Sequence, residues 1–312
     1  MSRLLIVLLV LLTPGAVRAQ NDTILSEKAL EAGLQIQQVA TDLPFPMGMV
    51  ALDDGSILVA TSPSESGNFY DSTGQILHLA DSDGDGTFET VTAVATDLPG
   101  SLVALARHED IVITTSAQGG DESLTFFRMS DDPNEPLVEL DRMHFNFQGA
   151  IHQSYGLAVR NTPGEGDSFD VFFNIGAAGN DTAGSNVRAS GPVSASLEPA
   201  TIYMVTISDE DGVLEFTEPV LVATGLRNAS ALLFHPETGD LLIGENGIDG
   251  IENPIVSYSA DELNVVEADA IGVEVIDFGF PDAYVDYATG EAVGDESDAV
   301  AFLPLEGDES EG

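Results

Sequence analysis

Side chains that could take part in redox or metal chemistry concentrate in a few short segments of the chain. The densest runs from Gly225 to Asp249 and holds the pair Arg227-Asn228 and the loop Glu245-Asn-Gly-Ile-Asp249. A fixed guanidinium stabilises an oxygen that gains negative charge in a water-excluded site, and hard oxygen ligands suit Ca²⁺. The segment therefore places a candidate cation, Arg227, near a loop that offers hard oxygen donors. An Arg227 that only pairs with one of the many carboxylates is the structural alternative.

A histidine suited to proton transfer lies upstream. His152 precedes Tyr155-Gly-Leu-Ala-Val159, and Asn174-Ile-Gly176 follows on the next predicted strand. A neutral imidazole near pH 7 can accept a hydroxyl proton, so His152 is one residue that could do this chemistry. His144 is the competitor, and a His152 satisfied by backbone groups is the ordinary alternative. The remaining histidines are expected on strands or turns: His78, His108 and His235.

A second candidate calcium loop is Asp81-Ser-Asp-Gly-Asp-Gly86. Asp81, Asp83 and Asp85 occupy positions 1, 3 and 5 of an EF-hand-like loop, with Gly86 at position 6. Position 12 is Thr92 instead of Glu, and no flanking helices are evident, so the segment is not an EF-hand. It predicts either a calcium site or a plain turn between blades.

The elements that must position these residues are short strands. Helical periodicity is nearly absent, and apolar runs alternate with clusters of Gly, Asp, Asn and Pro, which is typical of an all-β protein. The phrase Val-Ala-Thr-(Asp/Gly)-Leu recurs at 39–43, 94–98 and 222–226, each time before a strand, a tight turn and a second strand. Serial β-units of this length predict a six-bladed β-propeller with five to six blades represented; a β-sandwich is the alternative.

The stretch from Gly225 to Pro281 resembles the soluble glucose/sorbosone dehydrogenases, which are six-bladed quinoprotein propellers. The shared residues are Gly225-x-Arg-Asn228, His235-Pro-x-Thr-Gly239, Glu245-Asn-Gly-x-Asp249, Asp261-Glu-Leu-Asn264 and Phe278-Gly-Phe-Pro281. A looser likeness extends over Leu43 to Gly176.

The resemblance implies an enzyme that oxidises the C1 hydroxyl of an aldose with pyrroloquinoline quinone (PQQ) and Ca²⁺, and then passes electrons to an external acceptor. It implies that Arg227, Asn228 and His152 contact the quinone, with Arg227 facing its C5 oxygen and His152 acting as base. It also implies that the loop residues Glu245, Gly247 and Asp249 bind the calcium ion. After Ile175-Gly176 the family pattern has Asp or Ser, whereas this chain has Ala177. No Lys or Arg follows Arg227 to neutralise a tricarboxylate cofactor. The alternatives are a chain lacking terminal blades, or a non-catalytic propeller that binds a saccharide or protein partner.

Composition narrows the classes of partner. The chain has 53 Asp plus Glu against 9 Lys plus Arg, a net charge of −44, and no Cys. Such a field repels phosphate backbones and anionic lipid headgroups, which excludes nucleic acid and membrane surfaces as expected partners. The absence of Cys excludes disulfides and zinc–thiolate sites. Because salt screens self-repulsion, the charge also predicts a protein adapted to high salt.

The chain divides into four expected parts. Residues 1–19 read as a secretory signal peptide, with Arg3, the apolar run Leu4–Leu12 and Val17-Arg-Ala19 before the cleavage point, although an uncleaved anchor is the alternative. The mature protein is then expected to be secreted or periplasmic, without membrane insertion. Residues 20–37 form a linker with a short helix over Ser26–Gln38, residues 38–304 form the propeller, and residues 305–312 form an acidic tail or truncation point.

Overall fold

The structure, a computed structural model, describes residues 33, 34, 36–118, 121–146, 156–249, 259–287, 289–294 and 300–301. The predicted signal peptide, the acidic tail and the catalytic candidate His152 lie outside these residues. Most of the helix expected over Ser26–Gln38 also lies outside them, and residues 36–40 are non-helical. No helix among the described residues has the length and hydropathy needed to cross a bilayer.

The first sheet, blade 1, is an antiparallel meander in which four successive strands pair in chain order. A short 3₁₀ helix, η1 (Phe69–Asp71), follows its second strand. The strands are β1 (Gly48–Ala51), β2 (Ile57–Thr61), β3 (Gly74–Ala80) and β4 (Thr90–Leu98).

Blade 2 has the same meander and gains two strands from a later part of the chain. A hairpin beyond the third blade's second strand pairs with the edge of blade 2, so this sheet has six strands. Its strands are β5 (Ser101–His108), β6 (Ile111–Gln118), β7 (Asp121–Arg128), β8 (Val138–Asn146), β11 (Val187–Ser190) and β12 (Ala195–Leu197).

Blades 3 and 4 complete the series, and a small hairpin follows blade 4. In blade 3, β14 pairs with β13, and β19 runs parallel to β15. Blade 3 contains β9 (Leu157–Asn161), β10 (Ser168–Ile175), β13 (Thr201–Glu210), β14 (Val213–Phe216), β15 (Val220–Thr224) and β19 (Ile276–Asp277). Blade 4 contains β16 (Ala229–Phe234), β17 (Leu241–Glu245), β18 (Glu262–Val266) and β22 (Val300–Ala301), and the hairpin is β20 (Tyr284–Val285) with β21 (Ala292–Val293).

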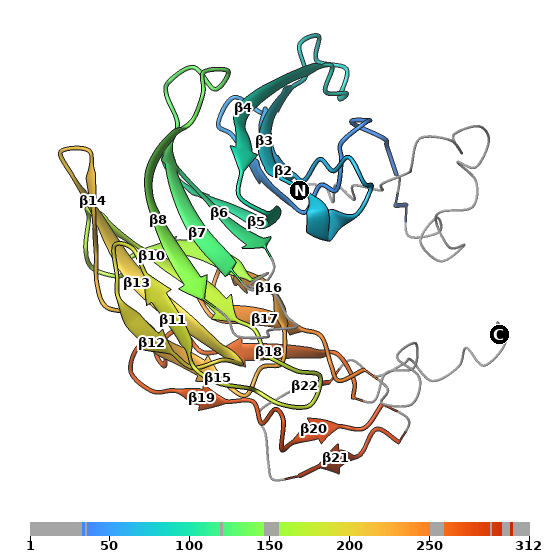
Figure 1. The fold of residues 1–312 in the computed structure, drawn as a ribbon, viewed down its shortest axis with the longest axis vertical. Coiled ribbons are helices and arrows are strands. Elements are labelled where there is room, and N and C mark those ends of the chain that lie inside the picture. Colours follow the sequence, from blue (N-terminus) through green and yellow to red (C-terminus); the bar gives the residue numbers. More distant parts are fainter. Residues whose placement is uncertain are drawn as a thin grey trace, which may run out of the picture.

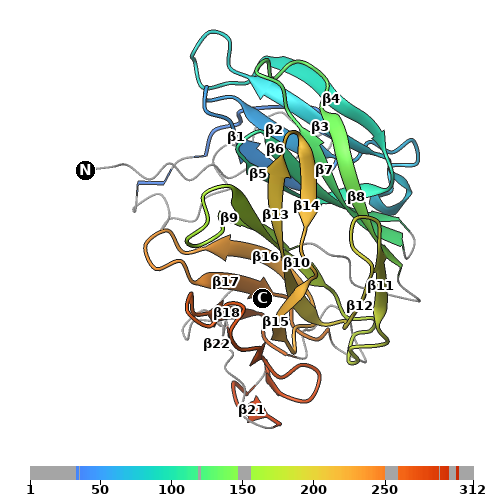
Figure 2. The same ribbon diagram turned by 90° about the vertical axis from the view of Figure 1, so that its left-hand side faces the viewer.

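The four blades follow one another around an arc, from blade 1 in blue to blade 4 in orange (Figure 1). Their first strands are neighbours: β1 contacts β5, β5 contacts β9, and β9 contacts β16, the last pair being visible from the side in Figure 2. Four blades lie within the described residues, against the five or six that chain length suggested. One reason is that the segment from 176 to 200 extends blade 2 instead of forming a blade.

Apolar cores lie between successive sheets. Phe126 and Phe145 of blade 2 pack with Phe173 of blade 3, and the rings of Phe145 and Phe173 stack with centroids 5.3 Å apart. Between blades 3 and 4, Phe172 and Ile243 belong to a second cluster. Apolar burial between neighbouring sheets therefore holds the blades in series.

The repeated phrase precedes the first strand of blades 1, 2 and 4, and its copies at 94–98 and 222–226 also lie at the end of a strand. Its fourth residue has a positive φ in all three copies: 57° at Asp42, 57° at Asp97 and 71° at Gly225. Asp tolerates this left-handed conformation better than most residues, and Gly adopts it freely. At Gly225 a Cβ would lie 2.3 Å from Oδ1 of Asp277, so only glycine fits there.

Candidate functional site

Arg227 lies between β15 and β16 and is 3% exposed. Its Nε donates to the backbone oxygen of Asn180 at 3.0 Å, and its Nη2 donates to Oδ1 of Asn180 at 2.8 Å. Nη2 also pairs with Oδ2 of Asp249 at 2.7 Å, and Nη1 donates to the oxygen of Asn246 at 3.4 Å. A buried cation requires such partners, and here Asn180 and Asp249 supply most of them.

The backbone of Arg227 is fixed as well. Its N–H donates to Oε1 of Glu245, and its oxygen accepts from the N–H of Ala177 at 2.9 Å. A similar hydrogen bond occurs in blade 3, where the side-chain Oδ1 of Asn174 accepts from the backbone N–H of Gly156 at 2.7 Å. In both blades a buried polar residue at the end of the second strand therefore fixes the start of the first strand.

Glu245 and Glu262 form a buried carboxyl pair in blade 4, each 6% exposed. Nδ2 of Asn264 donates to Glu245 at 3.0 Å and to Glu262 at 3.3 Å. Burial, together with repulsion from Glu262, raises the pKa of Glu245 to about 8, against the lowering effect of the Arg227 hydrogen bond. Burial also raises the pKa of Glu262. Glu245 is therefore mostly protonated near neutral pH.

The loop from Glu245 to Asp249 is shaped by packing. The N–H of Gly247 donates to Oδ1 of Asp261 at 2.9 Å, and the N–H of Ile248 donates to Oγ of Ser259 at 2.6 Å. A Cβ on Gly247 would lie 2.5 Å from the oxygen of Ala260. Close approach to residues 259–260 thus requires glycine here, independently of any metal.

The predicted calcium ligands of this loop are held in different surroundings. Glu245 is buried against the Arg227 backbone, whereas the Asp249 side chain is 58% exposed and pairs with the guanidinium. Oδ1 of Asn228 and Oδ1 of Asn264 are buried and have no hydrogen-bond partner among the described residues. A cavity of about 10 Å³, close to the space of one water, borders Arg227, Glu245 and Glu262. All these donors are hard oxygens, the ligand type that calcium prefers. Among the described residues, however, only the carboxylates of the Asp81–Glu89 loop are gathered closely enough to share one ion.

The quinone fits this cluster poorly. The Arg227 guanidinium is buried and engaged with three residues, and the cavity beside it is far smaller than a ring system. Asn228, the other predicted cofactor contact, donates through Nδ2 to Oδ1 of Asn246 at 3.3 Å. As these side chains stand, the cluster around Arg227 offers neither a free cation nor space for a tricarboxylate.

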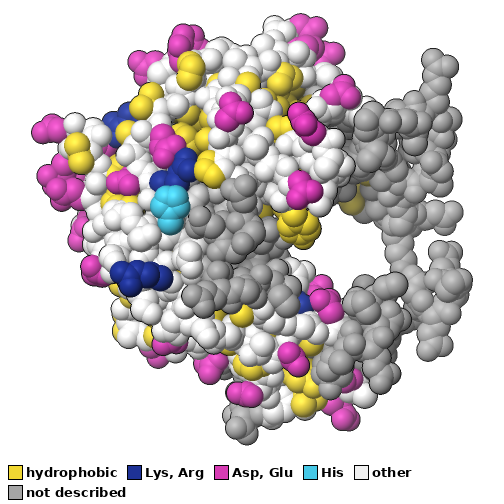
Figure 3. Space-filling view, viewed as in Figure 1, with side chains coloured by type: hydrophobic (Ala, Val, Ile, Leu, Met, Phe, Trp, Pro, Cys, Tyr) yellow, Lys and Arg dark blue, Asp and Glu magenta, His cyan; other side chains and the backbone are white. Residues whose placement is uncertain are grey.

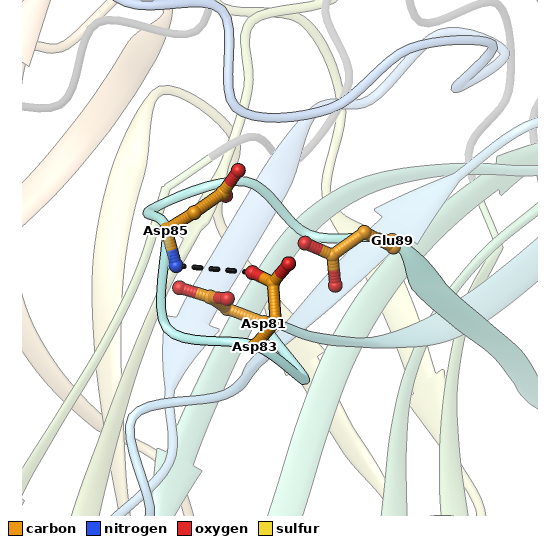
Figure 4. A group of neighbouring side chains, drawn as sticks. All are labelled: Asp81, Asp83, Asp85 and Glu89. Carbon is orange, nitrogen blue, oxygen red and sulfur yellow. Dashed lines mark hydrogen bonds between the residues drawn. The ribbon is translucent and has the colours of Figure 1, made fainter.

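In the second predicted calcium loop, the carboxylates lie close together and none of them forms an ion pair with a described basic side chain. Asp81, Asp83, Asp85 and Glu89 each place one carboxylate oxygen within 4.8 Å of the others (Figure 4). The loop joins β3 to β4 within blade 1, so the expectation of a turn between blades was wrong. The N–H groups of Gly86 and its neighbours lower the pKa of Asp81.

Glu89 and Asn180 were not identified from the sequence. Glu89 stands at position 9 of the loop, a position that contributes to calcium binding in EF-hands, and this spacing could have identified it. It accepts from the N–H and Oγ of Ser82 at 3.0 and 2.9 Å. Asn180 lies 47 residues before Arg227, and no local pattern marks it.

The described histidines lie on strands or turns, as predicted. His78 is on β3 and buried, with Nδ1 3.1 Å from Oδ1 of Asn134. His108 ends β5 and stacks on Phe169, and burial lowers its pKa. His235 follows β16 in a turn, and the competitor His144 is exposed on β8.

No protein-family model matches the sequence, and no curated protein matches it. Among solved structures, a Trichoderma reesei carbohydrate-active enzyme of family AA12 is 17% identical, with a TM-score of 0.51 over 80% of this chain and 59% of that chain. A glucose dehydrogenase is 15% identical, with a TM-score of 0.50 over 86% of this chain and 73% of that chain. The PQQ-bound aldose sugar dehydrogenase of Streptomyces coelicolor is 15% identical, with a TM-score of 0.46 over 85% and 70%.

The chain thus spans about three fifths of the length of the first of these structures. The likeness confirms the all-β propeller fold predicted from the repeats. This fold is the one implied by the sequence resemblance to the sugar dehydrogenases.

Proposed function

We propose that this chain is an exported, dehydrogenase-like propeller that oxidises the C1 hydroxyl of an aldose, with PQQ and Ca²⁺ as cofactors and an external electron acceptor. One observation carries the proposal. The separated parts of the sequence pattern, Arg227-Asn228, Glu245–Asp249 and Asp261–Asn264, meet in one cluster at the end of blade 4. Hydrogen bonds that require all three parts support a common function for the pattern.

Within this proposal, His152 is the base that accepts the sugar hydroxyl proton. It lies outside the described residues, but the chain four residues later is fixed by the hydrogen bond from Gly156 to Asn174. Arg227 is the cation expected to face the oxidant, a role that requires Asp249 to release it. Since the Asp249 side chain is 58% exposed, it is the partner that solvent or a metal can reach.

Calcium has two candidate places in the proposal. One is the loop of Glu245, Gly247 and Asp249, where unpartnered amide oxygens of Asn228 and Asn264 lie nearby. The other is the loop of Asp81, Asp83 and Asp85, to which the structure adds Glu89.

Reconstitution tests the enzyme. Purified full-length protein is mixed with PQQ and Ca²⁺ in high salt, and dye reduction is followed with a panel of aldoses. We expect retained quinone absorbance and turnover, abolished by His152→Gln with quinone binding unchanged. H144Q is the matched control and should keep its activity. Absence of both quinone absorbance and turnover would sink the proposal.

A non-catalytic propeller that binds a saccharide or protein partner is the second candidate function. The specific observation in its favour is that the Arg227 guanidinium is already engaged by Asn180, Asp249 and Asn246. Saccharide binding by calorimetry without quinone retention or dye reduction would support this candidate over the enzyme.

Export and adaptation to salt form the last part of the proposal. Expression of the full chain should yield a secreted or periplasmic product that begins at Gln20, which mass spectrometry would show. Unfolding of that product should require more denaturant in 2 M than in 0.1 M NaCl. Greater stability at low salt would contradict the adaptation.

A further inference from the structure

A surface of blade 2 differs in charge from the rest of this acidic molecule. No Asp or Glu occurs between residues 142 and 164 or between residues 182 and 197. Pairing of β11 with β8 brings parts of these two segments together, because Arg188 lies opposite Asn146 and Ser190 lies opposite His144. Figure 3 shows basic and histidine side chains on this face, with acidic side chains beside the upper basic group.

The hairpin of β11 and β12 is anchored by one of its faces. Val187, Ala189 and Leu197 are buried in the core between blades 2 and 3. Alternation along the strands places Arg188, Ser190 and Ser196 on the other, exposed face. Apolar burial thus holds the exposed polar residues on a rigid sheet.

Arg188 has no partner on this face. Among the described arginines, five each form an ion pair with an Asp or Glu: Arg107, Arg128, Arg142, Arg160 and Arg227. Arg188 is the exception, with no ion pair or hydrogen bond to any described residue. In a chain with 53 acidic residues, an arginine without an ion pair to any described residue is unusual.

An open surface depression of about 270 Å³ adjoins this arginine, and its lining side chains are mostly exposed. Arg188 lines it together with Asn186, Ser194, Ala195 and Ser196, and Nδ2 of Asn186 donates to Oγ of Ser196 at 3.2 Å. Sites for drug-sized ligands begin at about 300 Å³, so this depression suits a ligand of about one sugar ring. The lining offers one cation, hydroxyls and an amide, together with some apolar surface.

From these features we infer that the depression at Arg188 binds the carboxylate of a small polyhydroxylated acid, a sugar acid. The planar guanidinium matches a carboxylate bidentately, and the Ser and Asn side chains can exchange hydrogen bonds with hydroxyl groups. A monoanion is favoured over a dianion such as sulfate, because one unpaired cation neutralises one charge and the remaining protein repels the second. This site is independent of the proposed enzymatic activity.

Calorimetry on the full-length protein tests the inference in about 0.15 M salt, where the Debye length is about 8 Å. The probes are D-glucuronate, D-glucose, acetate and sulfate. We expect glucuronate to bind more tightly than the other three. Arg188→Gln should weaken glucuronate binding about tenfold or more, since a hydrogen bond to a charged group contributes about 1.5–3 kcal/mol.

Arg107→Gln is the matched control, because it removes the same charge from a different face and should leave glucuronate binding unchanged. Arg188→Lys keeps the charge but loses the fork, and should give an intermediate affinity. The unfolding midpoint of the Arg188 variants checks that the fold is intact. Equal binding of glucose and glucuronate, unchanged binding in Arg188→Gln, or no binding at millimolar glucuronate would each overturn the inference.

Discussion

The two candidate calcium regions hold carboxylates in opposite ways. Around Arg227, the carboxyls of Glu245 and Glu262 are buried. Glu245 accepts hydrogen bonds from the backbone N–H of Arg227 and from Asn264, and burial raises its pKa so that it is mostly protonated near neutral pH. At the Asp81–Glu89 loop, the carboxylates are mostly exposed and gathered within 4.8 Å, with N–H groups but no cationic side chain in the cluster.

The difference indicates different origins of stability. In the blade 4 cluster, each buried polar or charged side chain depends on a specific hydrogen-bond or ion-pair partner, so the loss of one side chain leaves another without its partner. In the blade 1 loop, solvent and ions screen the charges, so single changes matter little. The first region is expected to determine folding, and the second to respond to ions.

The largest expected effect is a pH dependence at Glu245. Its pKa is raised from 4.5 to about 8 in the folded protein, so the folded state binds this proton more tightly than the unfolded state. The contribution to stability is therefore complete below pH 4.5 and is lost as pH rises to 8. A shift of this size corresponds to on the order of 5 kcal/mol at 1.36 kcal/mol per unit.

Denaturant unfolding of the wild type and of E245Q between pH 4.5 and 8 measures this effect. The stability of the wild type relative to E245Q should fall as the pH rises, because only the wild type must ionise a buried group. The variant E218Q, which removes an exposed carboxyl, should follow the wild type. A constant difference between wild type and E245Q would show that Glu245 does not titrate in this range.

Removal of the buried guanidinium has the next largest expected effect. R227Q leaves Asp249 and Asn180 without their main partner, and breaking a buried pair costs about 3–5 kcal/mol. We expect about 3 kcal/mol in the free energy of unfolding, because Asp249 is half exposed. R107Q breaks the exposed pair with Asp53 and should cost about 1 kcal/mol or less, and equal losses would erase the distinction between the two regions.

The propeller architecture could be predicted from the sequence because the strands and turns that build each blade are encoded locally. The repeated Val-Ala-Thr-(Asp/Gly)-Leu phrase encodes a strand end and a residue of positive φ, and this conformation restricts Asp42, Asp97 and Gly225 in the same way. The grouping of Arg227, Glu245 and Asp249 was also predictable, since a strand, a turn and a second strand connect them. By contrast, the hairpin that extends blade 2 depends on pairing between β8 and β11, which no local pattern specifies.

The hydrogen-bond partners of Arg227 could not be predicted from the sequence. Asn180 holds the guanidinium through two hydrogen bonds, but it comes from a Gly-rich segment before β11. The role proposed for Arg227 assumed a free cation, and its saturation by Asn180 and Asp249 depends on packing between distant segments. Burial of Glu262 against Glu245 is a tertiary effect of the same kind.

The effect of calcium on the free energy of unfolding should differ between the two regions, because the Asp81–Glu89 carboxylates are mostly exposed and those of Glu245 and Glu262 are buried. If the Asp81–Glu89 loop binds the ion, the free energy of unfolding should rise with calcium concentration, by about 2.7 kcal/mol at one hundred times the dissociation constant. E89Q should reduce this gain, and E218Q should leave it unchanged. A gain that survives in E89Q and D83N but is lost in D249N would assign calcium to the blade 4 loop instead.

The smallest expected effect is the response of single charges to salt. Replacement of Asp83 by Asn relieves repulsion within the loop and keeps an acceptor for the N–H of Asp85, so D83N should gain about 0.5 kcal/mol of stability in 0.1 M NaCl. In 2 M NaCl the Debye length falls below about 3 Å, and this gain should disappear. The loss caused by R227Q should persist in 2 M NaCl, because salt does not screen a buried pair effectively. If both effects vanished together, the charges around Arg227 would be as exposed to solvent as those of the blade 1 loop.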